Sequence, residues 1–152
     1  MKPAFFLFAV TLAAVILSVG ADQEKDDVAE ITITAHKSEL LFDKKKFTVK
    51  AGQAFVLRFE NPDNMPHNVV FGQIGAMEEI GLLADKLAAN PEAAKQHYVP
   101  RSDQVLFSTP VVDDHSTFTI EFTAPKIPGD YPFLCTLPGH WRIMHGVMRV
   151  VK

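Results

Sequence analysis

The sequence predicts an all-β Greek-key sandwich or barrel of about eight strands with one helical insertion. Short segments in which apolar and polar side chains alternate recur between residues 31 and 151, and this period is typical of half-buried strands. These segments do not alternate with helical ones, which argues against a parallel sheet. The chain has 152 residues, 47% of them hydrophobic, enough for one folded unit around a single core.

The first 29 residues are expected to precede the fold. Residues 4–21 carry no charge, follow Lys2 and end in small side chains, so residues 1–21 are interpreted as a signal peptide that is cleaved. An uncleaved membrane anchor is the alternative, because this segment is just long enough to span a bilayer. Residues 22–29 form a polar leader and residues 30–152 the folded domain. We therefore expect a periplasmic or otherwise exported protein, attached to a membrane only if the first segment is retained.

Eight segments of the folded domain carry the strand signal. Reversals are expected at residues 50–53, 61–64 and 125–130, where glycine, proline, asparagine and aspartate favour turns. Such reversals favour antiparallel neighbours, so two packed sheets are the simplest architecture. The expected strands cover residues 31–35, 47–49, 55–59, 68–71, 105–107, 118–122, 131–134 and 147–151.

One segment is predicted as a helix because its apolar residues have the spacing of a helix face. Met77, Ile80, Leu83 and Leu87 follow this spacing, and Asn90 with the next proline ends the run. The apolar stripe is narrow. We therefore expect the helix to be a flap that covers one end of the sandwich, and not a helix that binds a partner.

Charge and cysteine content limit the classes of function that the chain can have. Fifteen Lys and Arg oppose 18 Asp and Glu, for a net charge of −3, and the absence of long basic blocks argues against nucleic-acid binding. Cys135 is the single cysteine, so the chain forms no internal disulfide. In an exported protein an unpaired cysteine indicates a partner chain, a reactive role or a metal.

A metal site is predicted from the spacing of the residues that follow the 131–134 strand. Cys135, His140 and Met144 form a C-x4-H-x3-M pattern between two expected strands, so one loop can direct three side chains to one pole of the sandwich. His67, at the start of another strand, is the obvious fourth donor. Two imidazoles, one thiolate and a weak thioether suit copper that changes oxidation state.

Two stretches of the chain resemble the azurin branch of the cupredoxins, including the auracyanins. These are residues 64–68, which read Asn-Met-Pro-His-Asn, and residues 135–140 with Met144; the resemblance extends over nearly the whole chain after residue 21. It implies a cupredoxin fold and a type 1 mononuclear copper centre with His67, Cys135 and His140 as strong ligands and Met144 as the weak axial ligand.

The resemblance also extends to residues that support the ligands, and the chain departs from the azurin pattern in two places. Asn68 and Thr136 match residues that brace the two ligand loops by hydrogen bonding. Pro66 stands where azurins have a glycine whose carbonyl approaches the metal, and the cysteine pair of the azurin disulfide is absent. Stability must then rest on the core.

The expected function is that of an exported one-electron carrier, not an enzyme. The sequence shows no Ser-His-Asp arrangement, paired-carboxylate motif or glycine-rich phosphate loop. The alternative is a copper carrier or storage protein that transfers the ion; a structural zinc module is weaker because thioether suits zinc poorly.

We expect a monomer that meets redox partner proteins near His140. The expected docking surface is apolar. The remaining histidines, His36, His97, His115 and His145, are interpreted as solvated side chains. The apolar patch expected around His140 comprises Trp141, Ile143, Pro138, Leu137 and Met65.

Overall fold

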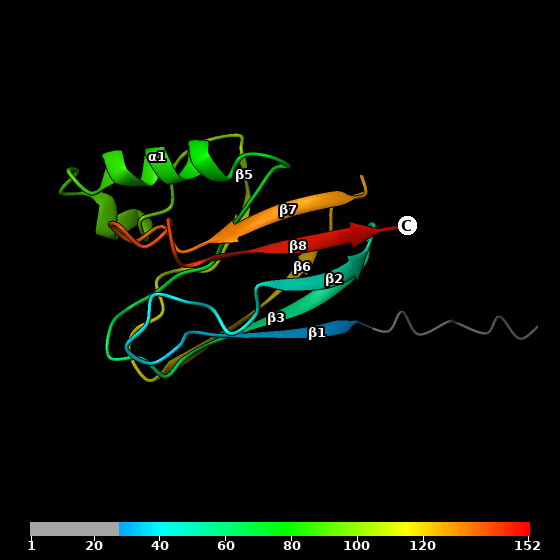
Figure 1. The fold of residues 1–152 in the computed structure, drawn as a ribbon, viewed down its shortest axis with the longest axis horizontal. Coiled ribbons are helices and arrows are strands. Elements are labelled where there is room, and N and C mark those ends of the chain that lie inside the picture. The colour runs from blue at the N-terminus through cyan, green and yellow to red at the C-terminus, as the bar shows by residue number, and fades with distance from the viewer. Residues whose placement is uncertain (1–27) are drawn as a thin grey trace, which may run out of the picture.

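A computed structural model describes residues 28–152 as a sandwich of two β-sheets with one helix on its outside (Figure 1). The expected signal peptide, residues 1–21, and most of the polar leader lie outside the described residues. Between residues 28 and 152, no helix is both long enough and apolar enough to cross a membrane.

All eight predicted strands and the predicted helix are present. The segment expected from residue 68 becomes a regular strand only at Val70, because Val69 N–H donates to the Thr109 side chain (3.0 Å) and not to a neighbouring strand. The elements are β1 (Ala29–Thr34), β2 (Lys46–Lys50), β3 (Ala54–Asn61), β4 (Val70–Gly72), α1 (Met77–Leu87), the 3-10 helix η1 (Ala93–Gln96), β5 (Val105–Ser108), β6 (Ser116–Thr123), β7 (Gly129–Leu134) and β8 (His145–Val151).

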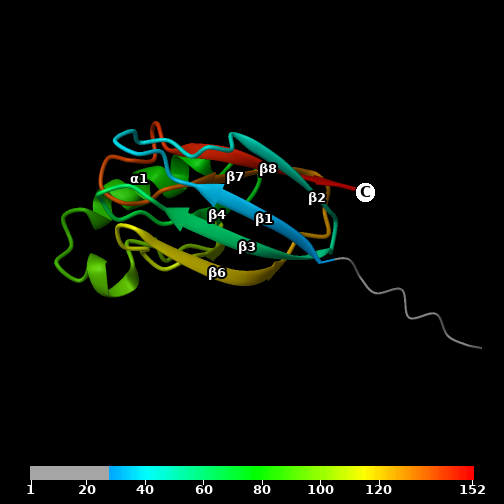
Figure 2. The same cartoon turned by 90° about the horizontal axis from the view of Figure 1, so that it is seen from below.

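The strands form two layers that face each other across the core (Figure 2). One sheet has the order β1-β3-β6, and the other has the order β2-β8-β7-β4-β5. Antiparallel neighbours were expected throughout, yet β1 pairs with β3, and β2 with β8, in parallel. The cause is that the chain passes from one sheet to the other between β1 and β2, so each of these strands joins an edge through a long connection instead of a short reversal.

The core between the sheets is built on phenylalanine rings. Phe133 of β7 lies at its centre, with ring centroids 5.5 Å from Phe42, 5.6 Å from Phe47 and 5.5 Å from Phe71. Because strand side chains alternate, Phe133 points into the core and the next residue, Leu134, points to the outer face. Cys135 then follows β7 with its side chain on the core side, which places its thiol at the end of the sandwich.

Helix α1 covers the outer face of the five-stranded sheet (Figure 1). Val70 of β4 and Leu134 of β7 pack against Ile80 of the helix, so these strands are buried on both faces. The helix therefore covers a sheet face near the end of β7, whereas a flap over the end of the sandwich was expected. Its buried residues also differ from the expected stripe: they are Ile80, Gly81 and Ala84, because the small side chains allow Trp141 to lie against the helix.

Candidate metal centre

The first ligand segment is held by backbone pairing at His67. His67 N–H donates to the Val112 carbonyl (3.1 Å), and Val112 N–H donates back to the His67 carbonyl (2.8 Å). This isolated bridge joins the β3–β4 connection, which contains His67, to the β5–β6 connection, which contains Val112, and the imidazole is fully buried. The ring is thus fixed at the same end of the sandwich as Cys135.

The second ligand segment is a closed loop between β7 and β8. Cys135 N–H donates to the Met144 carbonyl (2.9 Å), and Met144 N–H donates to the His140 carbonyl (2.9 Å). Gly139 has φ +80, a left-handed conformation that glycine adopts without steric cost and that turns the chain just before His140. These bonds keep the loop compact, and they hold Cys135, His140 and Met144 close to the sheet.

The brace predicted between the two segments is present. Asn68 Nδ2 donates to Thr136 Oγ1 (2.8 Å), and Thr136 N–H donates back to Asn68 Oδ1 (2.8 Å). Both side chains are fully buried, where hydrogen bonds are shielded from competition with water. The reciprocal pair fixes the residue after His67 against the residue after Cys135.

Three of the four predicted ligands lie close together. Cys135 Sγ is 3.8 Å from His67 Nδ1 and 3.4 Å from His140 Nδ1, and the three atoms lie within 4.8 Å of one another. Bonds of about 2.0 Å to nitrogen and about 2.3 Å to sulfur in a trigonal plane would separate nitrogen from sulfur by about 3.7 Å. The cluster therefore has the dimensions of a metal site.

The fourth predicted ligand, Met144, is fully buried in the same core cluster as Cys135. His140 differs from the other three because its side chain is only partly buried. The predicted donor set therefore combines two sulfurs and an imidazole inside the protein with one partly exposed imidazole.

Burial controls the protonation of the metal-free site. It raises the pKa of the Cys135 thiol to about 11, against the smaller opposing effect of backbone hydrogen bonds at Asn68 and Leu137. Burial, together with electrostatic repulsion from the neighbouring His67 imidazole, lowers the pKa of His140 below its ordinary value, and Asp63 opposes this shift. At neutral pH the metal-free protein therefore holds a neutral thiol and a neutral imidazole at Cys135 and His140.

Copper binding is expected to release a proton from Cys135 at neutral pH. The thiol is protonated below its pKa of about 11, and the metal binds the thiolate, so affinity should rise about tenfold per pH unit between about pH 7 and pH 9. Calorimetric titration in buffers with different heats of ionisation counts the released protons. An uptake of copper without proton release in this range would contradict a protonated Cys135 thiol in the metal-free protein.

Asp63 is a buried residue of the site that the sequence analysis missed. Its Oδ2 lies 3.1 Å from His67 Nε2, and its Oδ1 accepts N–H groups from Ser38 (2.9 Å) and Asn64 (2.8 Å). Burial opposes its ionisation, but these hydrogen bonds and the nearby His67 together lower its pKa. In the sequence, Asp63 is simply one of several turn-forming residues, and no spacing marks it as a partner of His67.

A contact between the ligand loop and α1 was also missed. Asp85 of α1 accepts hydrogen bonds from Trp141 Nε1 (3.1 Å) and from Arg142 Nη2 (2.8 Å), and the Arg142 guanidinium lies 4.4 Å from the Trp141 ring centroid. Trp141 is 8% exposed and Leu137 is 7% exposed, so both pack inward. Their expected place in an exposed apolar patch is wrong, because the helix covers the indole and the core takes up Leu137.

Substitution of Gly81 by alanine is expected to destabilise this contact. A Cβ at Gly81 would lie 2.3 Å from the Trp141 ring, so the indole must shift, and overpacking of this kind costs about 1–3 kcal/mol. The higher helix propensity of alanine offsets about 1 kcal/mol of this cost. Thermal unfolding and Trp141 fluorescence measure the effect, with Leu82→Ala on the exposed side of α1 as the control. A G81A variant as stable as the parent and with its fluorescence would be inconsistent with the close packing.

The remaining histidines lie outside the cluster. His36 pairs with Glu39 (3.3 Å), His97 accepts the Val111 N–H (3.2 Å) and His115 lies 3.1 Å from Asn64 Oδ1. These three are exposed, as predicted. His145 is partly buried, so it is less solvated than predicted; burial and the charge of Lys45 lower its pKa.

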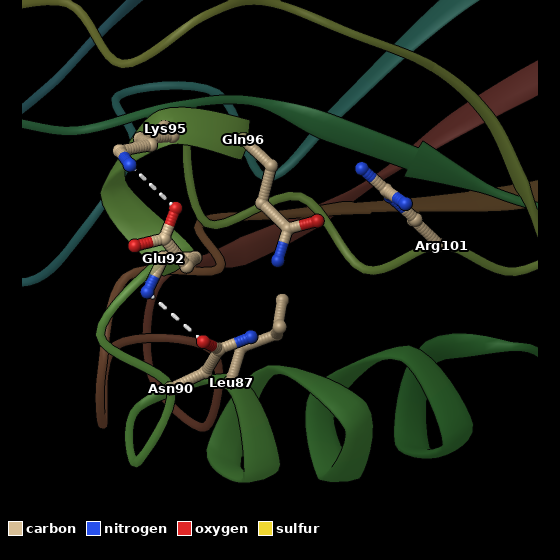
Figure 3. A pocket seen from close by; sticks show the side chains of 6 residues that line it. All are labelled: Leu87, Asn90, Glu92, Lys95, Gln96 and Arg101. Atoms are coloured by element: carbon tan, nitrogen blue, oxygen red, sulfur yellow. Dashed lines mark hydrogen bonds and ion pairs between the residues drawn. The ribbon is translucent and has the colours of Figure 1, made fainter.

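A separate surface groove of about 550 Å³ lies beyond the end of α1 (Figure 3). Glu92 and Lys95 form an ion pair across 2.6 Å, and Asn90 Oδ1 accepts the Glu92 N–H (2.9 Å). Its charged groups largely satisfy one another, and it shares no residue with the His67, Cys135 and His140 cluster. The residues that line it are Leu87, Asn90, Glu92, Lys95, Gln96 and Arg101.

A two-sheet sandwich that gathers two imidazoles and a thiol at one end defines a class of small metal-binding proteins whose donor set favours copper. The sequence matches the copper binding proteins of the plastocyanin/azurin family over residues 29–151. The chain belongs to this family, and copper is its cofactor.

Relatives from several bacteria are similar in sequence and structure. Auracyanin-A of Chloroflexus aurantiacus is 34% identical over 122 residues, covering 79% of this chain and 73% of the relative. Azurin-1 of Alcaligenes xylosoxydans xylosoxydans is 31% identical over 119 residues, covering 72% of this chain and 88% of the relative. The crystal structure of dithionite-reduced auracyanin from Roseiflexus castenholzii has a TM-score of 0.71 and 35% identity, covering 82% of this chain and 98% of that one. The chain is thus a blue copper protein similar to azurins and auracyanins.

Proposed function

We propose that the protein is a one-electron carrier in which His67, Cys135 and His140 are the strong copper ligands and Met144 is the weak axial ligand. The observation that carries this proposal is the cluster of His67 Nδ1, His140 Nδ1 and Cys135 Sγ within 4.8 Å at one end of the sandwich. Bound copper supplies a centre that accepts and returns one electron by alternating between Cu(II) and Cu(I).

Rigid ligand segments support electron transfer in preference to transfer of the ion. The Asn68 and Thr136 side chains lock the two segments together, and the Cys135 to Met144 backbone bond closes the loop. Ligands held in one arrangement need little rearrangement when the metal changes oxidation state. A protein that hands over copper would instead need ligands that can detach, and such mobility is opposed by the burial of His67, Cys135 and Met144.

The proposal is tested by the optical and electron paramagnetic resonance spectra of the Cu(II) protein near neutral pH. A thiolate bound to Cu(II) in a trigonal site gives an intense visible band and a narrow copper hyperfine splitting. A colourless copper complex would reject the proposed centre. Competition with a Cu(I) chelator separates the two functions, because slow release supports the electron carrier, whereas rapid release supports the carrier of copper ions.

We propose a docking surface around the partly exposed His140. Met65 is 40% exposed and Ile143 is 52% exposed, and Pro66 and Pro138 are also exposed. A small apolar surface around an exposed ligand suits brief contact with a redox partner. Compared with the surface expected from sequence, it lacks Trp141 and Leu137, which are buried.

Ile143→Asp is expected to slow electron transfer to the partner by about tenfold, because a desolvated charge in a small apolar interface costs on the order of 1 kcal/mol or more. The visible spectrum should not change, since Ile143 is not a proposed ligand. Stopped-flow kinetics with the partner measures the rate, and Leu82→Asp, an exposed leucine on α1, is the control. Equal rates for the parent and I143D would place docking elsewhere.

Export after cleavage behind residue 21 and a monomeric state complete the proposal. The motif of residues 1–21 supports export. Mass spectrometry of the protein purified from its native cells locates the new N-terminus, and an intact N-terminal segment would favour membrane attachment.

A further inference from the structure

The two carboxylate oxygens of Asp63 have different hydrogen-bond partners. Oδ1 accepts two backbone N–H groups, from Ser38 and Asn64, while Oδ2 faces His67 Nε2 at 3.1 Å. Asp63 is 2% exposed and His67 is fully buried. Asp63 N–H in turn donates to Asn61 Oδ1 (3.2 Å), and Asn61 Nδ2 donates to the Val112 carbonyl (3.0 Å). The carboxylate is therefore fixed before any metal arrives.

This arrangement dictates which nitrogen of His67 carries the proton. A carboxylate accepts hydrogen bonds and donates none, so the Nε2 that faces Oδ2 must carry the hydrogen. Nδ1 then presents its lone pair, and this atom is the one that lies 3.8 Å from Cys135 Sγ. The buried acid thus prepares His67 to bind a metal through Nδ1.

We propose that Asp63 is a positioning residue that sets the His67 tautomer and, through its negative charge, favours Cu(II) over Cu(I). This inference rests on the proposed ligand set, in which His67 binds copper through Nδ1. A carboxylate hydrogen-bonded to a ligating imidazole orients the ring and makes it a stronger donor. A buried negative charge behind the ring also stabilises the more positive oxidation state.

An amide cannot take the place of this carboxylate, although it has the same shape. Asparagine has a single acceptor oxygen, and at residue 63 this oxygen is needed by the N–H groups of Ser38 and Asn64. Its NH₂ group would then face His67 Nε2 and require a lone pair there, which moves the imidazole proton to Nδ1. In the reverse orientation the amide oxygen would face His67 Nε2, and the hydrogen bonds from Ser38 and Asn64 would be lost. The orientation that keeps those two bonds is favoured, and with it the tautomer that has its proton on Nδ1.

Nitrogen-15 NMR of the metal-free parent protein tests the first half of the proposal. The neutral imidazole of His67 should carry its proton on Nε2 in the parent, and in Asp63→Asn it should carry the proton on Nδ1. A parent protein with the proton on Nδ1 would overturn the proposal without any variant. Far-UV circular dichroism and the hydrogen-bonded N–H signals of Ser38 and Asn64 test whether D63N remains folded.

Copper affinity and reduction potential test the second half. D63N should bind copper about 10- to 100-fold more weakly in both oxidation states, because the imidazole proton must first move from Nδ1 to Nε2 and lose its favoured hydrogen-bond arrangement. The loss should be larger for Cu(II), and each tenfold excess of that loss raises the reduction potential by about 59 mV. The control is Asp130→Asn, which removes the same charge from an exposed carboxylate paired with Arg149 at the far end of β7.

The outcomes separate this inference from the proposed function. A parent protein without an intense visible band rejects the copper centre itself. A blue parent with D63N matching the parent in tautomer, affinity and potential leaves the electron carrier intact and rejects the role of Asp63. A potential that rises equally in D63N and D130N would show an effect of net charge alone and would also reject it.

Discussion

Cys135→Ser is expected to abolish the intense visible band of the copper protein completely. The band requires a thiolate bound to Cu(II), and Cys135 is the single cysteine of the chain, so no other residue can supply one. Serine cannot substitute chemically, because its hydroxyl stays protonated at neutral pH and is a hard donor that binds Cu(I) poorly. Absorption and electron paramagnetic resonance spectra of the two proteins, loaded with equal copper, measure the change.

The same variant should also lose about 1–3 kcal/mol of metal-free stability, because a hydroxyl replaces a fully buried thiol. Met144→Leu provides the comparison within the site: it removes the proposed axial ligand while keeping the thiolate, so the band should persist. Met148→Leu, a fully buried methionine of β8 outside the proposed ligands, controls for loss of sulfur from the core. A C135S protein with the parent's colour would refute the thiolate ligand.

Local patterns in the sequence were enough to predict the strands, the helix and the loop that holds three of the four proposed ligands. Period-two segments report burial on one sheet face directly, and the spacing of Cys135, His140 and Met144 lies within one loop. The brace of Asn68 with Thr136 also followed, but from the family resemblance and not from spacing.

Features that depend on distant pairing could not be predicted in this way. Asp63 and His67 are four residues apart, yet the role of Asp63 depends on the loop that presents Ser38 N–H to it. Likewise, a tryptophan next to a predicted ligand is expected in an exposed docking surface. Only its close contact with Gly81 of α1 shows that Trp141 is covered. The parallel pairing of β1 with β3 and of β2 with β8 also depends on distant parts of the chain, because the chain crosses between the sheets before each edge strand finds its partner.

Phe133→Ala is expected to lower the free energy of unfolding by about 3–5 kcal/mol, as is typical when a buried phenylalanine is removed. Phe133 is 0% exposed, lies among the rings of Phe42, Phe47 and Phe71, and presses on Gly146, where a Cβ would come within 2.3 Å of its ring. The tightly packed neighbours cannot collapse fully into the space, so a cavity remains. Chemical denaturation of the metal-free protein measures the loss without the stabilisation that bound copper adds.

Phe118→Ala is the matched control, since Phe118 lies on β6 of the other sheet and is only partly buried. It should cost clearly less than F133A, because less apolar surface leaves water at that residue. Phe133 also lies close to the proposed metal site, because it pairs with Gly146 across β7 and β8, the two strands whose ends hold the ligand loop. Those backbone bonds survive the substitution, so copper-loaded F133A should keep its visible band at low temperature and lose it at a lower temperature than the parent. Equal destabilisation by the two variants would mean that the core beneath the ligand loop is no more important to stability than the half-buried ring on the opposite sheet.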